Sequence, residues 1–97
     1  MLKHIVFMKF GAGVDALQIE DMKRSLASLP GKIDEIKGFE FGADILKSER
    51  SYDFALVANF KDLDSLKRYQ IHPDHMPVIQ KVRGLCETIL VVDFEWP

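Results

Sequence analysis

The chain has 97 residues, of which 47% are hydrophobic and 29% charged, as expected for one soluble globular domain and unlike a disordered segment. Its 13 basic and 15 acidic residues give a formal charge of −2, which predicts no basic surface for nucleic acid or anionic membranes. The single cysteine, Cys86, excludes an internal disulfide and suits a reducing compartment, so with no apolar run of membrane-spanning length we expect a cytoplasmic protein.

The chain opens with a strand pattern followed by a helix pattern. Residues Leu2–Phe10 are rich in branched and aromatic side chains and stop at a Gly-Ala-Gly segment, which predicts a strand. Asp15 and Gln18 have the spacing of a capping box at a helix N-terminus. Apolar residues at helical spacing follow: Ile19, Met22, Leu26 and Leu29. A Pro-Gly pair ends this predicted helix.

Two strand patterns come next. Residues Gly38–Ile45 alternate strictly between apolar and polar or small side chains, which predicts a strand. A polar hairpin-type connection over residues 47–51 then leads to a third strand over Tyr52–Phe60.

The rest of the chain predicts two short helices and a last strand. Asp62 is the expected N-cap of the first of these helices, which carries Tyr69. The second begins near Asp74, where Pro77 is tolerated because the N–H groups of a first helical turn have no partner within the helix. Residues Glu87–Trp96 alternate again and predict the final strand.

The order β-α-β-β-α-β is that of the ferredoxin-like split βαβ sandwich, an α+β fold, and residues 1–97 form a single domain. Helices can cover only one face of its sheet, yet several strands are apolar on both faces. We expect the uncovered face to carry Ile5, Phe7, Val57, Ile89 and Val91. Because an exposed apolar face of this size indicates an interface, we predict a homodimer whose sheets pack together as a dimeric α/β barrel.

Three histidines are the main candidates for chemistry. His72 and His75 have a spacing that resembles a metal-ligand pair, and the fold could add His4 from the first strand. However, Pro73 biases His72 toward extended backbone, so one helix cannot present both rings. No cysteine or second carboxylate cluster accompanies them. We therefore predict neither a metal nor another cofactor.

A general acid–base site is a stronger interpretation of these residues than a metal site. A histidine can exchange a proton near neutral pH, and a neighbouring tyrosine hydroxyl can donate to a developing oxyanion. Tyr69 and His75 flank one corner of the predicted fold, and His4 is a polar residue on an apolar strand face. The alternative is that His4 and His75 are buried, hydrogen-bonded residues that hold the corner in place. Residue types by themselves favour that structural interpretation.

The whole chain resembles the stress-responsive A/B barrel (Dabb) family. The first-strand histidine and the His-Pro-x-His corner together make the resemblance specific. The matching segments are Lys3–Phe10, Leu29–Ile33, Tyr52–Val57, Tyr69–His75 and Leu90–Glu95. The resemblance implies a ferredoxin-like protomer and a dimer, in agreement with the pattern of the strands. Many members of the family have no established reaction, so the resemblance says less about activity.

A plant polyketide cyclase of this family uses a cofactor-free His/Tyr pocket, and the resemblance transfers its positions one by one. The acid–base histidine falls on His75, its tyrosine partner on Tyr69, and the first-strand pocket histidine on His4. Two pocket positions depart from the cyclase, because a histidine is replaced by Phe54 and a tyrosine by Leu26. Together with His4 and His72, these two residues are the predicted ligand-binding residues of a more apolar pocket.

Two functions follow from these observations. The first is a small-molecule-binding or stress-associated module with an apolar pocket for a small apolar or carbonyl ligand and no established reaction. The second is a cofactor-independent enzyme acting on a carbonyl compound, as an aldol-type cyclase, lyase, isomerase or monooxygenase. A purely structural role as an assembly subunit is a third alternative. The sequence leaves open whether the chain is an enzyme.

Overall fold

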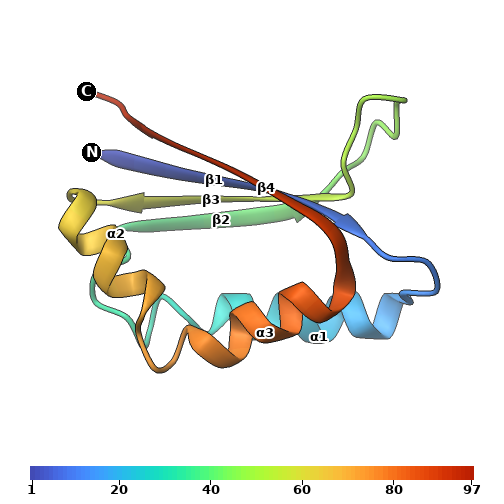
Figure 1. Cartoon of the computed structure of the whole chain (residues 1–97), viewed down its shortest axis with the longest axis horizontal. Helices are drawn as coiled ribbons and strands as arrows, with labels where there is room; N and C mark the ends of the chain where they lie inside the picture. Colours follow the sequence, from blue (N-terminus) through green and yellow to red (C-terminus); the bar gives the residue numbers. More distant parts are fainter.

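A computed structural model describes the chain from Met1 to Pro97 and contains four strands and three helices. In chain order these are β1 (Leu2–Phe10), α1 (Ala16–Ala27), β2 (Gly38–Ala43), β3 (Phe54–Phe60), α2 (Leu63–Gln70), α3 (Met76–Leu85) and β4 (Cys86–Glu95). The strands form one antiparallel sheet of order β2-β3-β1-β4, and all three helices lie on one side of it (Figure 1). This arrangement confirms the ferredoxin-like α+β fold. None of the helices combines the length and apolar character needed to cross a membrane.

The helix starts follow the predicted capping chemistry. The Asp15 carboxylate accepts a hydrogen bond from the Gln18 backbone N–H, and the Gln18 side chain accepts one from the Asp15 N–H, each over 2.9 Å. Asp62 accepts from the N–H of Ser65 in the same way and starts α2. These bonds satisfy N–H groups that have no partner within the first turn. α3 has no side-chain cap, but Pro77 lies in its first turn as predicted.

Several element boundaries differ from the prediction. β2 ends at Ala43, and Ile45 is 94% exposed in the following loop, because the Asp44 carboxylate binds the Lys47 N–H and Lys47 has a positive φ of 57°. This tight turn ends the strand. Residues 44–53 form a loop that projects from the end of the sheet, at the upper right of Figure 1. The last strand is shifted by one residue relative to the prediction.

The hydrophobic core fills the space between the sheet and the helices. Its largest fully buried side chains are Met8, Met22, Leu29, Ile33, Phe54 and Phe60. They come from β1, β3, α1 and the segment after α1, so burying them fixes α1 against the sheet. Three polar side chains are also buried, namely His4, Ser65 and His75.

The open face of the sheet is apolar as predicted, but two of its members were assigned to the wrong side. Strand register pairs Val91 with Val6 and Ile89 with Met8, so both residues of β4 face the helices. The open face instead carries Ile5, Phe7, Val57, Leu90, Val92 and Phe94. Both sides of the last strand are apolar, so alternation could not show which side faces the helices.

Candidate functional site

A cavity of about 700 Å³ lies between β1, β3 and β4 on one side and the helices on the other. Hydrophobic residues make up 12 of the 16 in its lining, including Leu26, Leu56, Val78, Ile79, Val82 and Ile89. The exposed lining residues are Gln70, Ile71, Met76, Arg83 and Val91, and they mark where the cavity meets solvent. An apolar cavity with a few polar groups is the usual form of a small-molecule site.

Tyr69 and His75 face each other in this cavity. α2 presents Tyr69 near its end, and the turn between α2 and α3 returns the chain so that the ring centroids are 4.2 Å apart. His75 Nδ1 lies 3.2 Å from the Gln70 carbonyl oxygen, which can only accept, so Nδ1 must carry the proton. A neutral His75 therefore has its lone pair on Nε2, and this nitrogen makes no hydrogen bond within the chain.

Burial sets the protonation of both groups. Desolvation lowers the pKa of His75 below its ordinary value of 6.5, and although the Gln70 carbonyl raises it, the charges of His4, Arg83 and His72 lower it further. Burial also raises the pKa of Tyr69, so its hydroxyl keeps its proton near neutral pH. The Tyr69 hydroxyl has no hydrogen-bond partner within the chain. The pair thus offers a neutral imidazole and an O–H donor to the same space.

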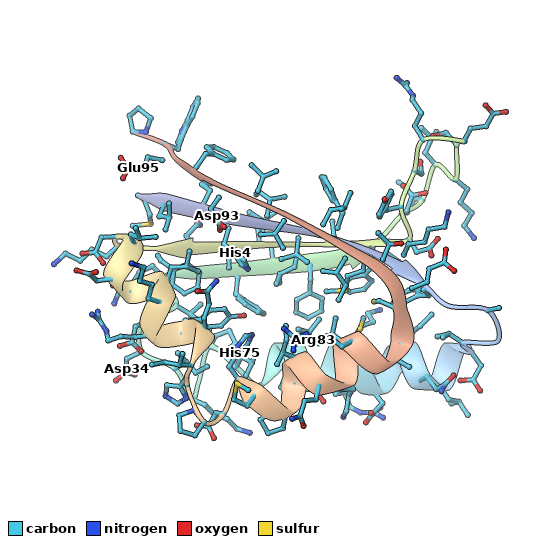
Figure 2. The ribbon with its side chains drawn as sticks, viewed as in Figure 1. His4, Asp34, His75, Arg83, Asp93 and Glu95 are labelled. Carbon is cyan, nitrogen blue, oxygen red and sulfur yellow. The ribbon has the colours of Figure 1, made fainter.

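His4 and Asp93 form a second polar pair. They are directly opposite each other on β1 and β4, and His4 Nδ1 lies 2.5 Å from the Asp93 carboxylate. Figure 2 shows the two side chains together on the helix side of the sheet, with His75 below them. The His4 ring packs edge-on against Tyr69, with their centroids 6.2 Å apart. The Asp93 carboxylate orients the His4 ring, because a hydrogen bond to one ring nitrogen fixes which nitrogen carries the proton.

Asp93 and Arg83 are two residues of the site that were not predicted from the sequence. Asp93 was detectable as a carboxylate that follows Ile89 and Val91 on the same face of the last strand, with Glu95 two residues further along. Arg83 lies four residues after Ile79 and therefore on the same face of α3, where it lines the mouth of the cavity.

Of the predicted site residues, the structure gathers His4, Leu26, Tyr69 and His75 around the cavity and places two elsewhere. Phe54 is 1% exposed and stacks on Phe41 within the core, outside the cavity lining. His72 lies in the turn before α3, where its Nδ1 accepts from the Asp74 N–H. Packing against β2 and the turn hydrogen bond therefore place these two residues outside the lining of the cavity.

His, Cys, Asp and Glu side chains do not gather in groups of three or more that could hold a metal ion. The titratable side chains in the lining of the cavity are His4, Tyr69, His75 and Arg83.

The fold and this cavity define the class of protein: a ferredoxin-like domain with a His/Tyr pocket between its sheet and its helices. The sequence model of the Dabb family, the stress responsive A/B barrel domain, matches residues 2–96. The chain belongs to this family.

Individual relatives agree with this assignment. An uncharacterized protein of Streptomyces coelicolor is 30% identical over 98 residues, covering 99% of this chain and 100% of the relative. Olivetolic acid cyclase of Cannabis sativa is 24% identical over 95 residues, covering 96% of this chain and 94% of the cyclase. The crystal structure of a dimeric ferredoxin-like protein of unknown function from Thermobifida fusca has a TM-score of 0.90 and 32% identity, covering 98% of this chain and 90% of that one.

Proposed function

We propose that the cavity binds a small, mostly apolar carbonyl compound. The observation that carries this proposal is the convergence of His4, Tyr69 and His75 on one otherwise apolar cavity. The apolar lining would bury the body of the ligand, while the Tyr69 hydroxyl, which lacks a partner in the chain, would donate to the carbonyl oxygen. This hydrogen bond would orient the ligand within an otherwise apolar cavity.

Binding of 2-octanone, followed by NMR, tests this proposal. We expect saturable shifts of the methyl groups of Ile79, Val82 and Ile89, which line the cavity, and no shifts at Ile5 or Leu90 on the open face. Ile79→Trp should abolish the shifts by filling the cavity. Leu17→Trp is the matched control, because Leu17 is 80% exposed on α1. Saturable binding that survives Ile79→Trp would contradict the proposal, as would the absence of binding to the wild type.

Acid–base catalysis on the carbonyl ligand is the second candidate function, favoured by the fixed proton position of His75. Because Gln70 holds the proton on Nδ1, the Nε2 lone pair is free to accept a proton from the carbon next to the carbonyl group. The electron pair of the broken C–H bond would form the C=C bond of an enolate, and the Tyr69 O–H would stabilise the negative charge that develops on the carbonyl oxygen. This step is shared by aldol-type cyclisation and by many isomerisations. Olivetolic acid cyclase, a relative named for a cyclisation, is consistent with it.

Exchange of the α-protons of 2-octanone in D2O measures this step directly. We expect His75→Ala to lose the protein-dependent exchange and Tyr69→Phe to slow it by about 100-fold, the lower range of general acid–base effects. His72→Ala is the matched control, because this histidine lies outside the cavity lining. If His75→Ala and His72→Ala gave equal exchange rates, His75 would not be the base. The proposed catalysis would then be wrong, and only the proposed ligand binding would remain.

The partner we propose for this chain is a second copy packed on the open face of the sheet. That face is apolar, and Phe7, Leu90, Val92 and Phe94 are each at least 42% exposed in the protomer. Similar structures from Thermobifida fusca and Bacteroides fragilis are described as dimeric. A second sheet would remove these side chains from water. It would not cover the cavity, which lies on the helix side of each protomer.

A further inference from the structure

Arg83 is the only permanently charged side chain in the lining of the cavity. The other polar residues there are His4, Gln70, Tyr69 and His75, and the lining contains no carboxylate. Asp93 approaches His4 from outside the lining. Figure 2 shows Arg83 on α3, the helix that follows His75. The cavity is therefore electropositive at one point and otherwise apolar or neutral.

Lys81 and Arg68 form ion pairs, whereas Arg83 does not, and neither do Lys67 on α2 and Arg24 on α1. On the same helix, Lys81 contacts the Asp21 carboxylate at 2.7 Å, and on α2 Arg68 contacts Glu35 at 3.2 Å. Arg83 takes part in no ion pair or hydrogen bond within the chain. A planar guanidinium presents a fork of N–H donors that matches a carboxylate, and pairing is stronger beside an apolar wall than in open water.

We propose that the ligand of this cavity is a monocarboxylate whose carboxylate binds the Arg83 guanidinium and whose apolar body packs against Ile79 and Val82. This inference rests on the proposed binding function and names its substrate class. The Arg83 charge also acts on His75, lowering its pKa, so the bound carboxylate would lie within electrostatic reach of the His/Tyr pair. An apolar keto acid combines both features.

A single carboxylate fits the lining better than a phosphate. The lining holds one guanidinium and no lysine, so only one permanent positive charge is available. A phosphate dianion carries two charges and three acceptor oxygens and would remain half-neutralised there. One carboxylate matches one guanidinium in both charge and geometry.

Octanoate and octanamide, which have the same shape and differ in charge, provide the test by calorimetric titration at pH 7.5. We expect the wild-type protein to prefer octanoate. Arg83→Gln should weaken octanoate binding about fivefold to tenfold, the range of one partly exposed charged pair, and leave octanamide binding unchanged. Arg24→Gln is the matched control, because Arg24 is an exposed arginine on α1 outside the cavity lining. This variant should bind both compounds as the wild type does.

Equal affinities for octanoate and octanamide, or an Arg83→Gln variant that keeps full octanoate affinity, would overturn the monocarboxylate assignment. Tighter binding of octyl phosphate than of octanoate would overturn it as well. Each of these results is compatible with binding of 2-octanone, so the underlying binding function would stand. If 2-octanone, octanoate and octanamide all failed to bind, both proposals would fall together.

Discussion

The two histidines of the cavity are held by different partners, and this difference separates their roles. A backbone carbonyl holds the proton of His75 on Nδ1, while burial keeps the ring neutral. A carboxylate contacts Nδ1 of His4 and orients that ring from the neighbouring strand. His75 is therefore suited to accept a proton, and His4 to hold a fixed position beside Tyr69.

Replacing His75 tests how much the fold depends on this ring. His75→Ala should lower the free energy of unfolding at pH 7.5 by about 1–3 kcal/mol, because a buried hydrogen bond and its packing are lost. Chemical denaturation at fixed protein concentration measures this, since the stability of a dimer depends on concentration. A neutral or stabilising change would show that the histidine is kept at a cost to the fold, as functional residues often are.

The stability difference between wild type and His75→Ala should also depend on pH. The pKa of His75 is lowered in the folded protein, so the unfolded chain binds the proton more readily. Acidification through the ordinary value of 6.5 toward the folded pKa therefore destabilises the wild type more than the alanine variant, which lacks this group. The difference should shrink over this window in denaturation curves measured at several pH values. A difference that grows on acidification would contradict the assigned direction.

Among the elements, α2 carries an N-terminal cap at one end and a residue of the candidate site at the other. Asp62 caps its first turn, and Tyr69 lies at its opposite end against His75. α1 has an equivalent cap at Asp15 and contributes Leu26 to the cavity from its far end. Since α2 has only eight residues, loosening its first turn affects a large part of the helix that positions the tyrosine.

Matched replacement of the two caps tests this connection. Asp62→Ala and Asp15→Ala should each lower the midpoint of thermal unfolding by a few degrees, because each removes a bond to a first-turn N–H. Asp62→Ala should in addition weaken 2-octanone binding in the NMR titration, whereas Asp15→Ala should not. Equal effects of the two variants on binding would show that α2 does not position Tyr69 independently.

At the scale of the whole molecule, the sheet divides the protein into two functional sides. The helix side contains the core and the cavity, while the open side carries apolar residues of β1, β3 and β4 that no element of the chain covers. Val92 is 57% exposed there and directly opposite Ile5. The sheet of a second copy fits such a surface, because it presents the same apolar face and both faces are buried when they pack together.

Val92→Glu tests this dimer by sedimentation. The wild type should sediment as a dimer at micromolar concentration, and the variant should shift toward monomer because it places a charge in the apolar contact. Leu17→Glu, on the exposed side of α1, is the matched control and should remain dimeric. A wild-type protein that sediments as a monomer at these concentrations would contradict the dimer.

The sequence by itself determined the element order, the helix caps at Asp15 and Asp62, and three of the polar groups of the site, because these depend on local spacing and on residue type. The tertiary structure decided which side of the last strand faces the helices, since both sides are apolar and only strand register distinguishes them. It also brought Asp93 to His4 and Arg83 to the cavity mouth, and it left His72 outside. Those contacts depend on packing between distant segments, which local pattern does not encode.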